Sequence, residues 1–465
     1  MASAPFLLSF LLICSAFSLH FSNANFVLPV VKDTIKSQYY TSLLVGNHPS
    51  TRVYLVIDLG NQWSWFACDL YGYNTTSHEL PCDSPKCELY APGTFCSAGS
   101  CGVDAYTPWS RGLYSNGLLE DTTRVYKQTK QNSLAQVLSK ADLPNFPFTC
   151  ANKGPLKGLS PHTKGVVTLA RVLVSLHSQI SSTFKVPRKF ALCLPSSTSS
   201  GYNGAIYFGG SPDYLSKSLI TTPLVINPNS TSPIYSPGDA SVEYFIKVRS
   251  IKVDGTPIRF SPSLLSFDIK EGVGGTKIST MDPYTVLHSE IYKTLVNVFV
   301  TKATAMKMTR VASVAPFGVC FSSKSVVNNA KTGPTVPIID IIMDGKSPLL
   351  HNKNARWRIY GANSMVKVSD SVMCLGFVDG GLEPVTSIVI GGKQMEDNLV
   401  EIDLETSKLG VTSSLLRMVH EYVTILAQEA WVCWNWERRV LDFCIYVMST
   451  FVLALANNIQ ASTRL

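Results

Sequence analysis

The sequence predicts a mainly β protein made of two related, β-rich lobes. Three observations predict it: short apolar runs that end at Gly, Pro or Asp-Gly turns, a single stretch of clear helical periodicity, and one pattern that occurs in each half. The length of 465 residues suits two or three domains. A composition of 45% hydrophobic and 15% charged residues is that of a globular chain, which excludes a largely disordered one.

The individual elements follow from local patterns. Strands are expected at 53–57, 63–66, 205–208, 244–253 and 387–390. The fourth run alternates and ends at Asp254-Gly255, as a hairpin strand does. A helix is expected at 288–302, because Ile291, Leu295 and Phe299 fall on one apolar face.

A repeated pattern divides the chain into two halves. A strand, a short turn of acidic or small residues and an apolar segment occur at 56–65 and again at 278–287. Each is followed much later by an apolar strand that ends near Gly, at 165–169 and 388–391. We therefore expect an N-terminal lobe at 25–211 and a C-terminal lobe at 212–416.

The N-terminus predicts secretion. Residues 6–17 are almost all apolar but too short to span a membrane, and they lead to the small, polar stretch Ser22-Asn23-Ala24. This is typical of a signal peptide, here 1–24. Two glycosylation sequons, at Asn74 and Asn229, agree with an extracellular or cell-wall location.

Twelve cysteines are present, and one of them, Cys14, lies in the signal peptide. Two C-x4-C pairs, Cys82/Cys87 and Cys96/Cys101, could suggest zinc, but zinc ligands are usually closer in sequence. In a secreted chain disulfides are the better interpretation, so no metal is expected.

The basic charge is diffuse. Forty Lys and Arg against 32 Asp and Glu give a net charge of +8, without a Lys/Arg block of the kind that binds nucleic acid. The eight His are scattered, and the sequence has no phosphate loop, dinucleotide fingerprint or zinc-protease helix. We expect neither a nucleic-acid partner nor a cofactor.

One acidic turn per lobe suggests aspartic-protease chemistry, in which two carboxylates about 3 Å apart share a proton. The first turn reads Asp58-Leu59-Gly60 and keeps the acid and the glycine. The chain resembles the pepsin-like family at both turns, and this resemblance places Ser279 at the position of the second acid, with Asp282 past the turn. A hydroxyl cannot share a proton as a carboxylate does, so a catalytically inactive pseudo-protease is expected. An active aspartic endopeptidase is the alternative.

Five blocks in the second half carry a narrower resemblance: 274–287, 310–318, 361–366, 374–381 and 387–392. They resemble the plant extracellular dermal glycoproteins and xyloglucanase-inhibitor proteins, which are related to wheat-type xylanase inhibitors and basic 7S globulins. The resemblance implies a secreted, bilobed pepsin-like (aspartic protease) fold that binds and inhibits glycoside hydrolases in plant defence. A basic 7S globulin-like storage or signalling protein is the other alternative.

The resemblance also implies site residues. In the xyloglucanase inhibitors basic side chains of the C-terminal half enter the acidic cleft of the enzyme. Lys331 stands where Arg is expected, before Gly333-Pro334, and Arg417 is the second candidate. Lys keeps the charge but loses the bidentate fork of Arg.

The same resemblance implies a disulfide pattern. Cys320 is expected to pair with Cys374, and Cys193 with a cysteine of the tail, where Cys433 and Cys444 are available. The remaining six are expected to close among themselves: Cys68, Cys82, Cys87, Cys96, Cys101 and Cys150.

The resemblance ends near Leu416, and the tail 417–465 departs from it. Its apolar run 440–456 is broken by Asp442 and is at the lower limit for a membrane span. We expect a divergent tail of doubtful structure, with membrane contact as the less favoured alternative.

Overall fold

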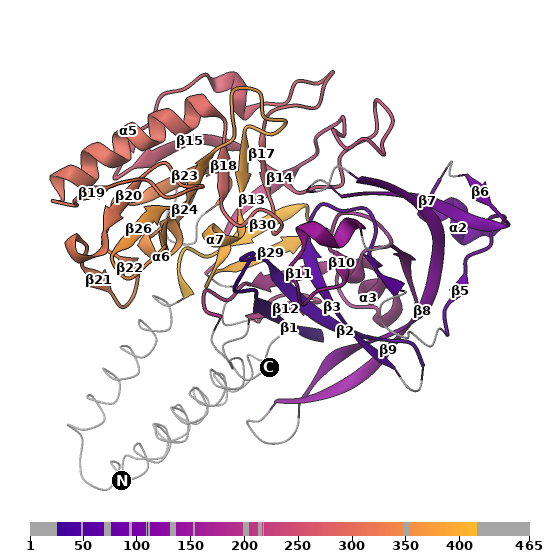
Figure 1. The fold of residues 1–465 in the computed structure, drawn as a ribbon. Helices are drawn as coiled ribbons and strands as arrows, with labels where there is room; N and C mark the ends of the chain where they lie inside the picture. Colours follow the sequence, from indigo (N-terminus) through magenta and orange to yellow (C-terminus); the bar gives the residue numbers. More distant parts are fainter. Residues whose placement is uncertain are drawn as a thin grey trace, which may run out of the picture.

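The structure is a computed structural model that describes residues 26–415 except 48–49, 69–75, 93–94, 108, 110–111, 131–135, 152–153, 199–203, 213–215, 217 and 347–353. It confirms the predicted mainly β, bilobed architecture. Figure 1 shows one lobe in indigo to magenta beside a second in rose to orange. The predicted signal peptide and tail lie outside the described residues.

The first lobe consists of short strands and a few helices. Its elements are β1 (Phe26–Lys32), β2 (Tyr39–Val45), β3 (Thr51–Asp58), β4 (Trp65–Phe66), β5 (His78–Glu79), α2 (Pro85–Tyr90), β6 (Cys96–Ser97), β7 (Ser100–Thr107), β8 (Gly112–Lys130), β9 (Gln136–Cys150), η2 (Gly154–Gly158), β10 (Gly165–Thr168), α3 (Leu176–Phe184), β11 (Lys189–Cys193) and β12 (Gly204–Phe208). Strands β8 and β9 form a long hairpin.

The second lobe has the same character. Its elements are β13 (Ile220–Val225), β14 (Phe245–Ile246), β15 (Val248–Val253), β16 (Thr256–Pro257), η3 (Pro262–Leu265), β17 (Thr276–Ile278), β18 (Thr285–Leu287), α5 (Ser289–Ala305), β19 (Arg310–Val311), β20 (Cys320–Ser322), η4 (Ser323–Ser325), β21 (Asn328–Asn329), β22 (Gly333–Pro334), β23 (Ile339–Asp344), β24 (Asn354–Ile359), α6 (Gly361–Ser364), β25 (Met365–Lys367), β26 (Val372–Leu375), β27 (Phe377–Asp379), β28 (Ile388–Ile390), α7 (Gly392–Met395), β29 (Leu399–Asp403) and β30 (Lys408–Val411).

The repeat seen in the sequence is a repeat of strand pairing. In the first lobe β3 and β10 run parallel, with Asp58 opposite Thr168. In the second lobe β17 and β28 run parallel, with Ile278 opposite Ile390. Strand β10 also pairs antiparallel with β4, as β28 does with β18. The turn after β3 and the turn after β17 therefore occupy equivalent places in the two lobes.

An antiparallel sheet joins the lobes. Its order is β1-β12-β11-β29-β30-β13, three strands from each half of the chain. In Figure 1 the yellow strands β29 and β30 lie between the lobes, beside β11. Because this sheet is continuous, its hydrogen bonds hold the two lobes together.

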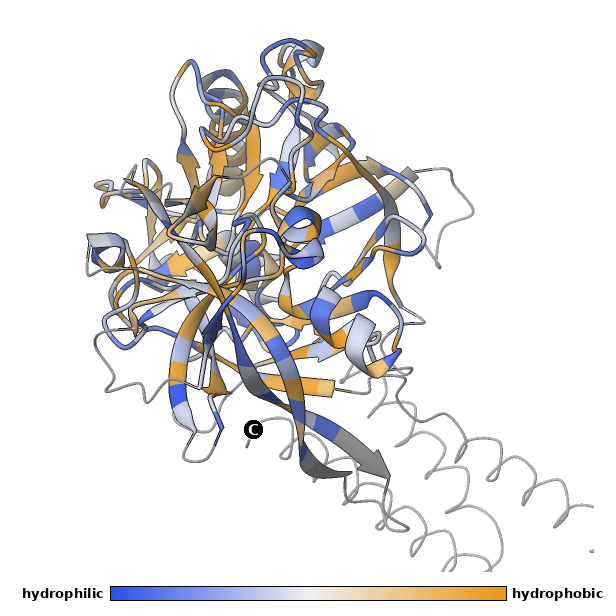
Figure 2. Ribbon diagram, turned by 90° about the vertical axis from the view of Figure 1, so that its right-hand side faces the viewer, coloured by the Kyte–Doolittle hydropathy of each residue, from blue (hydrophilic) through white to orange (hydrophobic). Residues whose placement is uncertain are grey.

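Burial explains why these segments became strands. Strands β10 and β28 are buried at every position, so they have continuous apolar runs rather than alternation. A single contiguous cluster of buried apolar side chains extends through both lobes, from Phe26 to Val411. Figure 2 shows hydrophobic residues, in orange, along the interior strands.

The predicted helix at 288–302 is confirmed as α5, which continues three residues further to Ala305. Its buried face contains Ile291, Leu295 and Phe299, and His288 caps its N-terminus by accepting the N–H of Glu290. The expectation of a single clear helix was wrong, because α3 is a further helix of nine residues. Three of its polar side chains, those of His177, Ser178 and Gln179, are buried, which hides its periodicity from the sequence.

Four disulfides join cysteines of the described residues. The first lobe contains Cys68–Cys150, Cys82–Cys96 and Cys87–Cys101, and the second contains Cys320–Cys374. Each C-x4-C pair is therefore divided between two bridges, and in the described chain no group of side chains could hold a metal. Cys193 is a free thiol among the described residues, and burial raises its pKa to about 12. Its expected partners in the tail lie outside them.

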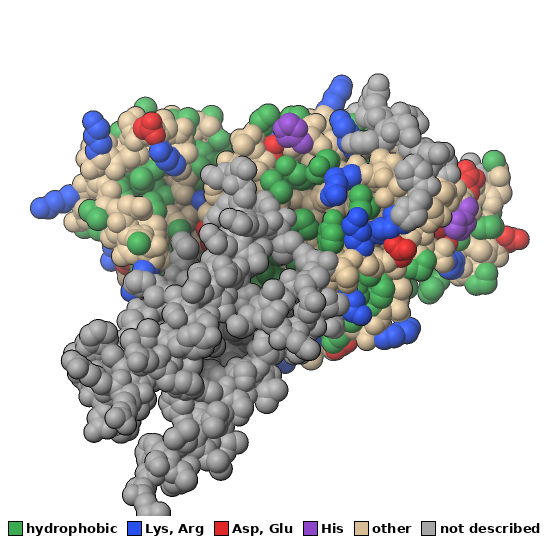
Figure 3. Space-filling model, turned by 90° about the horizontal axis from the view of Figure 1, so that it is seen from below, with side chains coloured by type: hydrophobic (Ala, Val, Ile, Leu, Met, Phe, Trp, Pro, Cys, Tyr) green, Lys and Arg blue, Asp and Glu red, His purple; other side chains and the backbone are tan. Residues whose placement is uncertain are grey.

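The surface carries dispersed charge. On the face shown in Figure 3, basic side chains are spread among hydrophobic and acidic ones. Within the described part of the chain, no helix is both long and apolar enough to cross a membrane.

Candidate functional site

The first turn of the candidate site begins at Asp58, the last residue of β3. Its side chain is 6% exposed, and its Oδ1 accepts the N–H of Gly60 at 2.8 Å. Burial raises the pKa of Asp58 to about 6, and the charges of Glu243 and Asp282 act in the same direction. The Gly60 N–H and the charge of Lys277 oppose this rise. Asp58 is therefore a carboxyl group that gives up its proton near pH 6.

The second turn begins at Ser279, directly after β17. Its hydroxyl accepts the N–H groups of Met281 and Asp282, both at 3.2 Å. It thus makes the same local contact as Asp58, but with a neutral hydroxyl. Within the described chain Asp282 makes no hydrogen bond to Asp58, so it does not take the place of a second carboxylate there.

One hydrogen bond across the lobes joins the two turns, and it is donated by the second turn. The Oγ1 of Thr280 donates to the carbonyl oxygen of Ile57 at 2.6 Å. The equivalent position of the first turn is Leu59, a buried apolar side chain that cannot donate. This role of Thr280 was not predicted from the sequence, although its place directly after Ser279 was the available signal.

An ion pair next to Asp58 was also missed. Nζ of Lys277 lies 2.6 Å from Oε1 of Glu243, and both side chains are at most about a quarter exposed. A Cβ at Gly60 would lie 3.1 Å from the same Oε1, so Glu243 packs over the first turn. Burial alone would lower the pKa of Lys277, but the charge and hydrogen bond of Glu243, with Asp282 and Asp58, raise it. The ammonium group of Lys277 therefore stays protonated beside the buried carboxyl group of Asp58.

The loop that carries Lys331 joins β21 and β22. Three hydrogen bonds fix its backbone: the N–H of Lys331 donates to Oδ1 of Asn329 at 2.8 Å, the N–H of Ala362 donates to Thr332 O at 2.9 Å, and the hydroxyl of Ser414 donates to Lys331 O at 3.1 Å. The side chain of Lys331 is half-buried and forms no ion pair with any described residue. The loop thus presents one unpaired cation from a fixed backbone.

The other predicted site residues are only partly described. Ser414 brings the end of the second lobe against the Lys331 loop, but Arg417 lies outside the described residues. Asn74 lies outside them too. The side chain of Asn229 donates to the carbonyl oxygen of Lys270 and accepts the N–H of Gly238.

Comparison with known proteins gives a consistent result. The family described as "Xylanase inhibitor N-terminal" matches residues 39–210, and the one described as "Xylanase inhibitor C-terminal" matches residues 243–413. The chain is 41% identical to the "Probable aspartic proteinase GIP2" of Nicotiana benthamiana, over 85% of this chain and 90% of that protein. It is 34% identical to "Gamma conglutin 1" of Prunus dulcis, over 84% of this chain and 86% of that protein.

Solved structures agree. The "Crystal structure of edgp" matches with a TM-score of 0.76 and 38% identity, over 85% of this chain and 96% of the other. The "Crystal structure of Basic 7S globulin from soybean" matches with a TM-score of 0.67 and 28% identity, over 84% and 97%. Together these matches show a family whose members are named both as proteinases and as globulins.

Proposed function

Because the chain belongs to the xylanase-inhibitor family of pepsin-like proteins, we propose that it is a secreted, catalytically inactive member that binds and inhibits cell-wall-degrading glycoside hydrolases in plant defence. The observation that carries this proposal is the Lys331 loop, which holds an unpaired cation on a fixed backbone.

The chemistry of a glycosidase cleft suits such a loop. The cleft contains two carboxyl groups on either side of the scissile bond. An ammonium group inserted between them would form charge-assisted hydrogen bonds and exclude the substrate. Because three backbone hydrogen bonds already fix the loop, little conformational entropy would be lost on binding.

The turns support the inactive part of the proposal. Proton sharing between two carboxyl groups needs two acids, whereas the second turn offers the hydroxyl of Ser279. The disulfides support secretion, because such bridges persist in oxidising compartments.

The test is inhibition of a panel of xyloglucanases and xylanases by the purified protein. Once a target is found, we expect Lys331→Ala to bind it more weakly, mainly through a faster off-rate. The loss of binding free energy is about 2–5 kcal/mol if the pair of Lys331 with a carboxylate of the enzyme is fully buried. Lys302→Ala on α5 is the matched control, because that lysine is also half-buried, and it should bind normally. Equal binding by Lys331→Ala and the parent would show that the contact lies on another loop.

A storage or signalling protein is the second candidate. The similarity to gamma conglutin and basic 7S globulin favours it. Failure of the whole panel, together with abundant accumulation in seeds, would favour this candidate over the inhibitor.

A further inference from the structure

A pocket of about 340 Å³ lies between the two lobes, apart from the Asp58 and Ser279 turns. The first lobe contributes Lys32, Asp33 and Ser37, and the second contributes Tyr284, Lys393 and Glu396. Its volume is at the lower end of the range for small-molecule sites.

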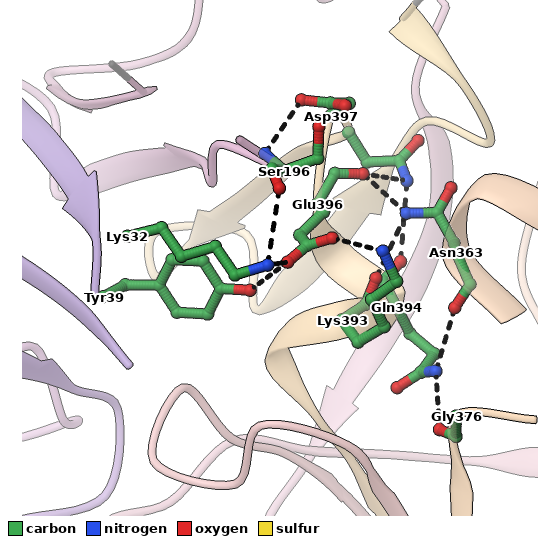
Figure 4. Close-up of polar contacts among 10 residues, drawn as sticks. Lys32, Tyr39, Ser196, Asn363, Gly376, Lys393, Gln394, Glu396 and Asp397 are labelled. Atoms are coloured by element: carbon green, nitrogen blue, oxygen red, sulfur yellow. Dashed lines mark hydrogen bonds and ion pairs between the residues drawn. The ribbon is translucent and has the colours of Figure 1, made fainter. Parts of the chain in front are cut away.

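A buried carboxylate organises one wall of the pocket (Figure 4). Glu396 is 1% exposed, and its Oε1 lies 2.6 Å from Nζ of Lys32 and 2.7 Å from the hydroxyl of Tyr39. Its Oε2 lies 2.7 Å from Nζ of Lys393. Burial and the charge of Glu396 raise the pKa of Tyr39, so this hydroxyl stays protonated and donates. Two lysines, one from each lobe, therefore share one carboxylate.

The backbone around this carboxylate is held in place. Nδ2 of Asn363 donates to Glu396 O at 2.6 Å, and Nε2 of Gln394 donates to Gly376 O at 3.0 Å. All four of these residues lie in the second lobe. The backbone of Glu396, the carboxylate that both lysines contact, is thus held by a hydrogen bond within the second lobe.

The pocket retains unused hydrogen-bonding capacity of both kinds. An ammonium group has three donors. Among the described residues Lys393 uses one of them, to Glu396, and Lys32 uses two, to Glu396 and to Ser196 O at 3.4 Å. Asp33 is 2% exposed; its Oδ2 accepts two backbone N–H groups, whereas its Oδ1 has no hydrogen-bond partner among the described residues. A buried polar atom without a partner is costly, so a ligand or water is expected there.

The charge of the lining is positive. This holds for the wall around Glu396, where Lys32 and Lys393 share one carboxylate and leave 2 − 1 = +1, whereas Lys367 is paired with Asp370 at 2.7 Å. A neutral sugar has no charged group to pair with the lysines. A bare phosphate is too small to fill the pocket and would lie near the Asp33 carboxylate. A ligand that has both an anionic group and hydroxyl donors can pair with the lysines and also donate a hydrogen bond to Asp33.

We propose that this pocket binds a small acidic sugar, one or two rings of a uronic acid. The carboxylate of the sugar accepts N–H groups of Lys32 and Lys393, and a ring hydroxyl donates to Oδ1 of Asp33. Because the pocket draws residues from both lobes, the bound sugar links them and stabilises their relative position.

The test is calorimetric titration and thermal denaturation of the full purified chain with digalacturonate, galactobiose and inorganic phosphate. We expect digalacturonate to bind and to raise the melting temperature, and galactobiose and phosphate to do neither at the same concentration. Lys393→Met should weaken digalacturonate binding about tenfold or more, because a charge-assisted hydrogen bond is lost. Lys408→Met, an exposed lysine outside the pocket, is the control and should bind normally.

A second variant guards against misfolding, since Lys393→Met also removes a partner of Glu396. Thr198→Trp changes an exposed residue of the lining and fills the pocket without altering its charge. It should abolish binding while the melting temperature of the free protein stays that of the parent. Equal binding of galactobiose, stronger binding of phosphate, or undiminished binding by Thr198→Trp would each overturn the proposal.

Discussion

At the scale of single residues, the proposed inactivity depends on Ser279. Its hydroxyl accepts two backbone N–H groups in the turn where a second carboxylate would be needed. Lys277 stands beside Asp58 and is paired with Glu243. This cation favours the ionised form of Asp58, but burial outweighs it and raises the pKa of Asp58 to about 6.

We therefore predict that neither the parent nor Ser279→Asp cleaves protein. The single change restores an acid but leaves Leu59 without a hydroxyl and Lys277 in place. The measurement is hydrolysis of casein at acid pH, with and without pepstatin. Pepstatin-sensitive cleavage by the pure parent would refute the inactive assignment, and cleavage by the variant alone would show that Ser279 is the sole defect.

Asp58 should also make stability depend on pH. Its pKa in the folded protein is about 6, above the value near 3.9 of an unfolded chain. Between about pH 4 and pH 6 the folded state keeps a proton that the unfolded state has released, so the free energy of unfolding falls as the pH rises. The contribution is present at low pH and is lost as the pH passes about 6.

We predict that Asp58→Asn is more stable than the parent at pH 7, by on the order of 3 kcal/mol, and that this advantage disappears near pH 4. Asparagine keeps an acceptor for the Gly60 N–H without burying a charge. Denaturant unfolding at the two pH values measures the difference. Glu383→Gln, an exposed acid, is the control and should show no such gain. An equal effect of Asp58→Asn at both pH values would contradict the raised pKa.

At the scale of elements, the β21–β22 hairpin is the feature on which the proposed inhibition depends. Gly333 has φ +72°, and a Cβ there would lie 2.6 Å from the backbone N of Ala362. Any other residue would be strained and would push the loop away from α6. The position of Lys331 is thus set by packing two residues further along the chain.

We predict that Gly333→Ala destabilises the protein by roughly 2–3 kcal/mol and weakens hydrolase binding. Gly255→Ala is the matched control: its φ is +76°, but nothing lies within 4 Å of its Cβ position. That variant should cost only about 1 kcal/mol, for the left-handed backbone alone. Thermal unfolding of the two variants separates the steric clash of the added Cβ from the strain of the left-handed backbone. Equal losses of stability would exclude a clash with Ala362.

At the scale of the whole molecule, the continuous sheet and the disulfides hold the fold. Cys68–Cys150 closes a loop of 82 residues, whereas Cys82–Cys96 closes one of 14. A longer loop removes more conformational entropy from the unfolded chain.

We predict that replacing Cys68 and Cys150 by Ala costs about 1.5 kcal/mol more than the same change at Cys82 and Cys96, from loop length alone. Chemical denaturation of the two double variants measures this difference. Peptide mapping of the unreduced protein should show all four bridges. Free thiols throughout the first lobe would refute both the pairing and the secreted location.

The two-lobed β architecture and the asymmetry of the two turns could be predicted from the sequence. Strand runs, Gly turns and the repeat at 56–65 and 278–287 are local, because the period of a strand and the geometry of a turn show within a few residues. Asp58 and Ser279 could be located from their place in that repeat. The lobe boundary near 211 and the role of Arg417 stay predictions.

The surroundings of these turns, and the contacts between residues distant in sequence, could be seen only in the folded chain. The brace from Thr280 to Ile57 spans 223 positions, and the pair of Lys32 with Glu396 spans 364. Glu243 and Lys277 are only 34 positions apart, and they meet beside Asp58 because Glu243 lies just before β14, which pairs with the strand of Lys277, β17. Such contacts have no periodic signal in the sequence, since they depend on how the sheet between the lobes brings separate segments together. The inter-lobe pocket arises in the same way, from charges that lie far apart along the chain and close together in the fold.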